Sequence, residues 1–437
     1  MSKLTVFAKA AVTAPGKMQS NVFVEIDGGK VTKITCLKRE ADISADVLFP
    51  GFIDPHVHCR DANQGAKETI RTAGEAAARG GVTRVHDMPN TSPPILTETD
   101  ALKRMETAGK SGTPVGYALY MGLTSKPSQI AEAVTCVRKY RDVAGLKLYA
   151  GESTGELAVT GREDQALVYR TLVKLRYRGV LMVHCEDVEK FRSWQWNPKN
   201  PRTWCDARPP EAEVFSVKAQ LRLAAQFGFR GKLHVCHASL PETIGLLKDA
   251  AHAVHAGCGV TPHHVMLSRE SMGSGKRGLL CKVNPPLRDR VSVEALRKEL
   301  AAGRVRWIET DHAPHRQEEK LNPPHASGVP GLDTYANFVS FMIKNLRMTL
   351  PEIARLTSME AARLFNLPPA EIKPGSIANL SLIDMQPQVV NGRDLRTRCG
   401  WSPYEGMTFP GRCRATIVGG EVVYDGKDAR WEQVRAL

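Results

Sequence analysis

The sequence predicts a (β/α)8 barrel joined to a small β-sandwich domain that both ends of the chain build together. The middle of the chain alternates between apolar, β-prone runs and amphipathic helical stretches, which is the pattern of a barrel of parallel strands. Both ends read instead as short β-segments. Several central runs end in a side chain that can bind a metal, and barrel enzymes carry their chemistry at the carboxyl ends of the strands.

The two ends of the chain are expected to form one sheet domain. Residues 1–49 contain strand patterns at 5–8, 22–26 and 30–34, and Asp27-Gly28-Gly29 is a hairpin turn signal. Residues 371–437 contain an alternating strand at 378–384 and a hairpin at 415–424. Because these β-rich ends flank a different middle, we expect them to assemble around a barrel that spans residues 50–370.

The barrel itself is expected to contain eight strands separated by helices. The candidate strands are 52–58, 82–87, 115–121, 145–149, 180–184, 232–237, 259–262 and 305–310. The candidate helices include 68–79, 127–140, 165–178, 211–226, 240–251 and 293–300. This alternation predicts parallel strands with the helices outside.

Composition narrows the class of protein. The chain has 437 residues and 42% hydrophobic content, enough for one large domain and a smaller one. It contains no run of about 18 apolar residues and its first residues lack the apolar core of a signal peptide, so we expect a cytoplasmic protein without a membrane span. The net charge of +14 is spread along the chain, which favours a solvated surface that steers anions over nucleic-acid binding.

A pair of histidines opens the candidate metal site. His56 and His58 are separated by one residue, so they share one face of their strand and form half of a zinc site. Arg60 continues that face and directs a fixed positive charge into the same pocket. Asp311 ends the eighth strand; it would bind the same metal through one oxygen and leave the other for proton transfer.

The remaining candidate ligands end strands four to six. His184 and His237 would give a second metal two nitrogen ligands, and nitrogen and oxygen donors suit zinc, with manganese or cobalt as substitutes. Lys147 binds a cation only if its amine takes up CO2 to form a carbamate, because a protonated lysine has no acceptor. Two metals bridged in this way activate water at neutral pH.

The other cysteines and histidines are expected to be structural. Cys59, Cys185 and Cys236 each lie beside a candidate ligand, and strand alternation predicts that they point away from the metal and pack in the core. None of the ten cysteines forms a C-x-x-C pair, which suits a reducing compartment. His263 and His264 follow the seventh strand and are candidates for an outer shell around the ligands.

These motifs resemble the amidohydrolase superfamily and, within it, the dihydroorotases, over nearly the whole chain. The general part of the resemblance is Gly51-Phe52-Ile53-Asp54 followed by His56, His58 and Arg60. The more specific segments are Met88-Pro89-Asn90-Thr91, Thr261-Pro262-His263-His264, Val283-Asn284-Pro285-Pro286-Leu287-Arg288 and Asp311-His312-Ala313-Pro314-His315. One departure is Asp61-Ala62-Asn63, where the family usually has Glu-Pro-Gly.

The resemblance implies an activity and a set of roles. Dihydroorotases interconvert N-carbamoyl-L-aspartate and L-dihydroorotate, an anionic substrate pair, in the synthesis of pyrimidines (UMP). Two Zn²⁺ ions per subunit would be bridged by N6-carboxylysine at Lys147, with Asp311 as the catalytic proton carrier. One zinc would bind His56, His58 and Asp311, and the other His184 and His237. The implied substrate contacts are Arg60, Asn90 and His315 to the carboxylate, and Asn284 with the backbone of Ser327 and Gly328 to the ring.

Three questions stay open at this point. Ser153, Thr154 and Gly155 belong to a small polar loop that is either a mobile lid or an ordinary surface loop. The main alternatives in function are an allantoinase or hydantoinase-like cyclic-amide hydrolase, and an inactive scaffold for aspartate transcarbamoylase. Asn284 and His315 speak against the first, and the intact ligand set against the second. Aspartate transcarbamoylase is a candidate partner, and a homodimer or a monomer is expected.

Overall fold

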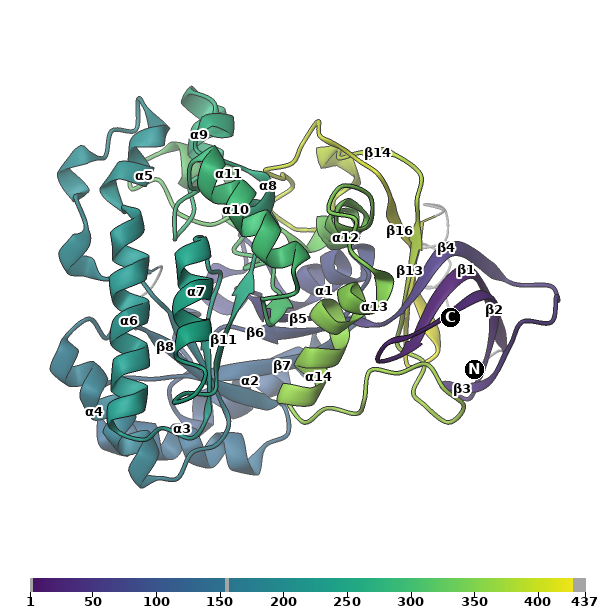
Figure 1. The fold of residues 1–437 in the computed structure, drawn as a ribbon, viewed down its shortest axis with the longest axis horizontal. Coiled ribbons are helices and arrows are strands. Elements are labelled where there is room, and N and C mark those ends of the chain that lie inside the picture. Colours follow the sequence, from purple (N-terminus) through teal and green to yellow (C-terminus); the bar gives the residue numbers. More distant parts are fainter. Residues whose placement is uncertain (1–2, 154–156, 427–437) are drawn as a thin grey trace.

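The structure is a computed structural model that describes residues 3–153 and 157–426. Its strands form an eight-stranded sheet, a seven-stranded sheet and a two-stranded ribbon of β14 (Gln388–Val389) and β15 (Thr408–Phe409). Figure 1 shows the larger sheet surrounded by helices, with the smaller sheet to one side. Thr154 and Gly155 of the proposed lid lie outside the described residues.

The eight-stranded sheet is a barrel of parallel strands in sequential order from β5 to β12. An isolated parallel bridge between Val57 and His312 brings its two edges together, and the His58 N–H donates to the His312 carbonyl at 2.8 Å. The predicted barrel is therefore confirmed as a nearly closed one. Its strands are β5 (Phe52–Val57), β6 (Val82–Asp87), β7 (Gly116–Gly122), β8 (Val143–Tyr149), β9 (Val180–His184), β10 (Lys232–Val235), β11 (Ala256–Val260) and β12 (Trp307–Ile308).

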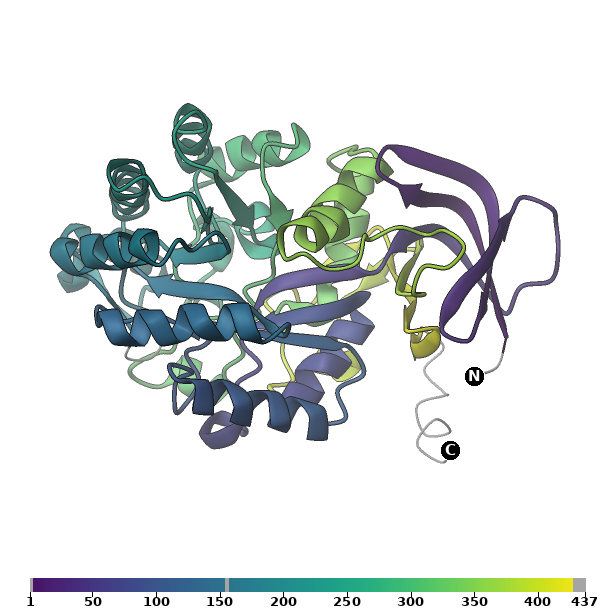
Figure 2. The same cartoon turned by 90° about the horizontal axis from the view of Figure 1, so that it is seen from below.

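Helices cover the outside of the barrel, as Figure 2 shows from below. Thr69 caps the first of them and Thr97 the second, because each threonine side chain accepts a backbone N–H of the first turn. The main covering helices are α1 (Ile70–Arg79), α2 (Glu98–Lys110), α3 (Pro127–Lys139), α4 (Arg162–Lys174), α6 (Pro210–Gln226), α7 (Pro241–Asp249), α10 (Arg290–Ala301) and α12 (Tyr335–Lys344). Shorter helices lie at α5 (Trp204–Ala207), α8 (Pro262–Met266), α9 (Gly275–Leu280), α11 (Gln317–Leu321), α13 (Leu350–Ala354) and α14 (Glu360–Leu364).

Two barrel strands are shorter than the sequence pattern predicts by two residues or more. The sixth, β10, ends at Val235 rather than at residue 237, and the eighth, β12, contains only Trp307 and Ile308. His237 and Asp311 consequently lie beyond their strands, and both adopt a left-handed backbone with φ of 40° and 46°. Strand alternation does not apply to a residue in that conformation, so the direction of these two side chains is set by the turns.

The seven-stranded sheet combines the two ends of the chain. It has the order β17-β16-β13-β4-β1-β2-β3, and the ends meet where β4 pairs antiparallel with β13, as at Leu48 and Leu382. The strands are β1 (Leu4–Ala14), β2 (Lys17–Asp27), β3 (Lys30–Thr35), β4 (Ile43–Pro50), β13 (Leu380–Asp384), β16 (Arg412–Val418) and β17 (Glu421–Asp425). Purple and yellow segments lie side by side there in Figure 1. The composite sheet is confirmed, and the exact domain boundaries stay a prediction.

Apolar packing separates the inside of the barrel from its outer layer. Ile53, Met182 and Trp307 belong to a buried cluster within the barrel, whereas Leu181 and Val183 pack outward beneath the helices. This alternation along β9 places His184 on the inner face. Within the described ranges, no helix is both long and apolar enough to cross a membrane.

Candidate metal centre

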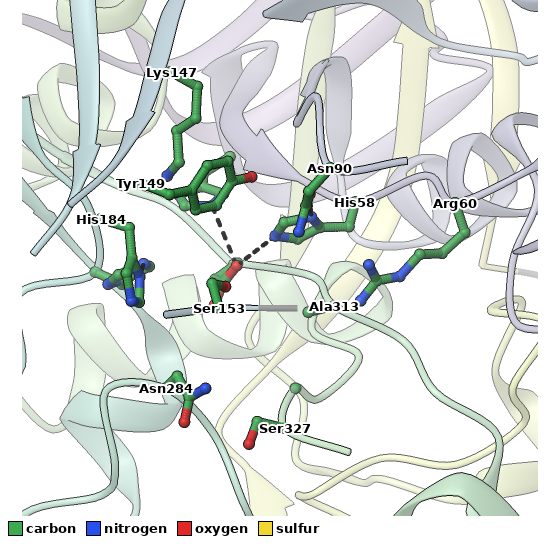
Figure 3. A pocket seen from close by; sticks show the side chains of 14 residues that line it. His58, Arg60, Asn90, Lys147, Tyr149, Ser153, His184, Asn284, Ala313 and Ser327 are labelled. Carbon is green, nitrogen blue, oxygen red and sulfur yellow. Dashed lines mark hydrogen bonds and ion pairs between the residues drawn. The ribbon is translucent and has the colours of Figure 1, made fainter. Parts of the chain in front are cut away.

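One pocket collects nearly all the candidate site residues at the carboxyl ends of the barrel strands. Figure 3 shows several of them, from Lys147 and His184 on one side to Arg60 on the other. Of the described residues that the sequence predicted to contact metal or substrate, only His315 is missing from its wall. The lining residues are His56, His58, Arg60, Asn90, Lys147, Tyr149, Ser153, His184, His237, Asn284, Asp311, Ala313, Ser327 and Gly328.

The first group of candidate ligands consists of His56, His58 and Asp311. One oxygen of Asp311, Oδ1, lies 3.2 Å from His56 Nε2 and 3.0 Å from His58 Nε2. The ligand atoms of the three buried residues lie within 4.8 Å of one another. Burial lowers the pKa of His56 to about 4, with help from the charge of Lys147. Burial also lowers the pKa of His58, so both rings are neutral and have a lone pair to offer.

The second group is a pair of opposed imidazoles. Nδ1 of His184 lies 3.1 Å from Nε2 of His237, and both side chains are buried. On its other side, His184 Nε2 is 3.2 Å from Glu186, whose carboxylate accepts a hydrogen bond from Arg208 at 2.9 Å. Glu186 therefore directs the opposite nitrogen of His184 into the pocket, which is the usual role of a carboxylate behind a metal-binding histidine.

Lys147 lies between the two groups and is fully buried. Its Nζ donates to Sγ of Cys236 at 3.0 Å and lies 4.9 Å from the centre of the Tyr149 ring. A thiol is a weak partner for a buried ammonium. A carbamate at this nitrogen would be negatively charged and could bind a metal ion together with the imidazoles that line the same pocket. The surroundings of Lys147 therefore fit a carbamate.

The contact with Lys147 corrects the prediction for Cys236. Cys59 and Cys185 pack in the outer core as expected, but Cys236 belongs to the cluster inside the barrel. Along β10, alternation places His234 and Cys236 on the inner face. His237 then reaches the same pocket only because its positive φ turns the chain. The prediction was wrong because it took His237 as the reference for the inward face.

The donor set fits a metal centre. Two groups of buried side chains among the described residues have the spacing to hold an ion: His56, His58 and Asp311, and His56, Cys236 and Glu309. Nδ1 of His237 and Nδ1 of His56 are buried and find no hydrogen-bond partner in the part of the chain that the structure describes. Buried imidazoles with free ring nitrogens around two carboxylates are characteristic of a site that binds cations.

The opposite wall of the pocket carries Arg60. Its Nε donates to the Pro314 carbonyl at 3.3 Å, and Nη2 lies 3.3 Å from His315 Nε2. Nη1 is buried and has no hydrogen-bond partner within residues 3–153 and 157–426. The backbone at Arg60, Asp61 and Ala62 is left-handed, with φ between 44° and 62°, and this turn aims the guanidinium inward. A buried guanidinium with one free edge is suited to an anion.

His315 supports this wall from behind rather than lining it. Its Nε2 contacts Arg60 and also lies 3.1 Å from the Ser327 carbonyl, next to Gly328. Burial and the neighbouring charges of Arg60 and Lys67 lower the pKa of His315, which keeps the ring neutral.

Asn284 also lines the pocket, and it accepts a hydrogen bond from Trp204 Nε1 at 3.1 Å.

Sequence reasoning missed three polar groups that contact the ligands. Tyr149 lines the pocket with a buried hydroxyl, and its position two residues after Lys147 on the same strand was the available signal. Glu186 and Glu309 lie behind ligand histidines, and no local motif marks them. Asn90 accepts from His58 Nδ1 at 2.8 Å, so it touches a ligand as well as the pocket. The outer-shell role of His263 and His264 stays a prediction; His264 bonds Thr261 and the Pro285 carbonyl.

Comparison with known proteins agrees with this geometry. A family model described as the amidohydrolase family matches residues 47–187. The chain is 32% identical over 430 residues to a dihydroorotase from Halobacterium salinarum, covering 95% of this chain and 96% of that protein. A dihydroorotase from Archaeoglobus fulgidus is 33% identical over 399 residues, with 89% and 90% covered.

Solved structures share the fold at lower identity. An L-hydantoinase (dihydropyrimidinase) from Arthrobacter aurescens superposes with a TM-score of 0.84 at 23% identity, covering 97% of this chain and 96% of that one. A dihydropyrimidinase from Brevibacillus agri has a TM-score of 0.85 at 21% identity, with 98% and 96% covered. At these identities, the likeness establishes a common fold only, and the substrate has to be inferred from the residues of the pocket.

Proposed function

We propose that this chain, which belongs to the dihydroorotase family of amidohydrolases, catalyses the reversible cyclisation of N-carbamoyl-L-aspartate to L-dihydroorotate. The family makes it a hydrolase of the carbon–nitrogen bond of a cyclic amide. The choice of substrate rests on Nη1 of Arg60, which has no hydrogen-bond partner in the part of the chain that the structure describes and belongs to the same pocket as the candidate metal ligands.

The proposed metal centre contains two zinc ions bridged by carboxylated Lys147. His56, His58 and Asp311 would hold one ion, and His184 and His237 the other. Zinc at this position would supply a Lewis acid for the amide carbonyl and a water of lowered pKa. The supporting geometry is the convergence of Asp311 Oδ1 on two histidines and the opposed ring nitrogens of the second pair.

The chain's own groups would bind the substrate from the opposite wall. Arg60, Asn90 and His315 would hold the ring carboxylate. Because His315 contacts the Arg60 guanidinium, it would also keep that group in place. Asn284 and the backbone at Ser327 and Gly328 would contact the ring amide groups. Gly328 has φ of 137°, and a Cβ there would press against the Ala313 carbonyl, so only glycine lets these two segments approach.

Asp311 would carry the proton between the two halves of the reaction. It is buried, and burial raises the pKa of its carboxyl above the usual value. Its Oδ1 faces the two histidines, which leaves the second oxygen to accept a proton during ring opening and return it to the leaving nitrogen. In ring closure, the same carboxyl would take the proton from the attacking nitrogen.

Substrate preference tests the proposal against its main rival. The zinc- and bicarbonate-treated protein should turn over dihydroorotate and should prefer it strongly to allantoin and dihydrouracil, which lack the ring carboxylate. A preference for either neutral ring would favour the allantoinase or hydantoinase alternative. A protein that binds no zinc and stays inactive after this treatment would favour the scaffold alternative, for which aspartate transcarbamoylase remains the predicted partner.

A further inference from the structure

Glu309 is a buried carboxylate next to two of the candidate metal ligands, His56 and His237, and it has no part in the proposed reaction. It follows β12 directly and has no solvent exposure. Oε2 lies 3.0 Å from His234 Nε2 and accepts from Trp307 Nε1 at 2.7 Å. Oε1 accepts the main-chain N–H of His237 at 2.5 Å and lies 3.5 Å from His56 Nδ1.

The neighbours of Glu309 require both of its carboxylate oxygens to accept hydrogen bonds. The Trp307 indole and the His237 main chain can only donate, so each oxygen must accept. His56 Nδ1 finds no hydrogen-bond partner elsewhere in the described chain, and His56 Nε2 faces Asp311 on the pocket side. A proton on Nδ1 would therefore point to Glu309 and leave the lone pair of Nε2 for a cation.

Space for this carboxylate comes from the neighbouring strand. A Cβ at Gly259, on β11, would collide with the carboxyl group of Glu309. Because Gly259 has no side chain, the Glu309 carboxylate can occupy this space next to His56. The stacked rings of His234 and Trp307, 4.1 Å apart, hold the other side.

We propose that Glu309 is a positioning residue for two metal ligands at once. It fixes His56 in the tautomer with the proton on Nδ1, and it seats His237 through its main-chain N–H at the point where the chain turns. This inference rests on the proposed function, because it takes His56 and His237 as ligands of the metal centre. Glu309 touches neither substrate nor the reacting atoms.

Glu309→Gln is the sharpest substitution because it preserves shape and removes only the acceptor character of one oxygen. The new amide NH2 replaces one of the two oxygens. In one orientation it faces the His237 N–H and His56, and in the other it faces the Trp307 indole, so in both a donor meets a donor. In zinc-loaded protein, we expect metal affinity to fall about 10- to 100-fold, the usual loss when an outer partner of a ligand histidine is removed. The KM for dihydroorotate should stay close to that of the wild type, because the Arg60 wall is untouched.

A matched control separates positioning from burial. Glu213 is equally buried, and it accepts from Ser239 and Thr243 while touching none of the six candidate ligands. Glu213→Gln should lower the thermal midpoint without changing zinc affinity or the visible spectrum of the cobalt-loaded protein. Glu309→Gln should change both, since cobalt absorption reports the geometry of its ligands.

The outcomes distinguish this inference from the proposed function. A wild-type protein without metal or dihydroorotase activity would defeat the proposed function. If the wild type is active and Glu309→Gln loses stability but keeps zinc affinity and the cobalt spectrum, then Glu309 is only structural. A third equivalent of zinc that is lost in the variant would make Glu309 a ligand, with His56 and Cys236, and would overturn positioning.

A measurement on the wild type keeps the inference testable if the variant does not fold. A neutron structure of the zinc-loaded protein should show a deuteron on His56 Nδ1, directed at Glu309. Its absence from Nδ1, or a His56 ring turned away from Glu309, would contradict the assignment.

Discussion

Replacing Arg60 by alanine should remove the preference of the pocket for a ring that bears a carboxylate. The guanidinium is buried, and its Nη1 has no partner in the described chain, so a substrate carboxylate would make a new charge-assisted hydrogen bond there. Such bonds contribute about 1.5–3 kcal/mol. The kcat/KM for dihydroorotate should therefore fall about 10- to 150-fold.

The assay compares two substrates on one pair of proteins. Initial rates with dihydroorotate and dihydrouracil, measured for the zinc-loaded wild type and Arg60→Ala, give the change in preference. Dihydrouracil lacks the carboxylate, so its small kcat/KM should be nearly unchanged. Arg60→Lys keeps the charge but loses the planar fork, and its preference should be intermediate.

Two results would refute this role for Arg60. The alternative is that Arg60, which also donates to the Pro314 carbonyl and contacts His315, mainly supports the pocket wall. In that case, both substrates would lose kcat/KM by the same factor, and Arg60 would be a support rather than a carboxylate anchor. An unchanged kcat/KM for dihydroorotate would show that the carboxylate binds elsewhere.

Three further predictions concern the metal bridge, the proton carrier and a buried amine. Lys147→Ala should abolish turnover, and short carboxylic acids should partly restore it by replacing the carbamate; full activity without them would contradict the bridge. Asp311→Asn should retain zinc by metal analysis but stop turnover, and normal turnover would exclude Asp311 as the proton carrier. Burial, assisted by Arg208, lowers the pKa of Lys282 from 10.5 to about 7. Between these values the unfolded chain keeps a proton that the folded chain has lost, so stability should rise with pH there. Lys282→Met should therefore stabilise the protein most near or below pH 7. Denaturant unfolding should show the difference in stability between the variant and the wild type shrinking as the pH rises from 7 to 10.5. A constant difference would mean that Lys282 keeps its ordinary pKa.

Local patterns predicted most of the scaffold. Alternation of apolar residues located the barrel strands within a few residues, because the two-residue period of a strand and the longer period of a helix are local properties. Helix α2 was missing from the expected helices, although Thr97 and Asp100 form a capping box at its start. Helix α4 begins at Arg162 rather than 165, directly after Gly161.

The candidate site was predictable where its residues share a strand. His56 and His58 line one pocket because alternate residues at the end of β5 project to one face, whereas a left-handed turn brings Arg60 to the same pocket. Cys236 was misplaced because the strand ends one residue before it and the next residue turns left-handed, a feature that depends on how the neighbouring strands pair. The roles assigned to these residues stay predictions for the experiments above.

By itself, the sequence determined the barrel class and the kinds of side chain offered to a cation, since both follow from the spacing of residues along short stretches. The folded molecule alone shows that Lys147 faces Cys236, that Glu309 lies next to His56, and that Nη1 of Arg60 has no hydrogen-bond partner among the described residues. These contacts join residues far apart in the chain. They depend on where each strand ends and which side chain the adjacent strand omits, and no local period contains that information.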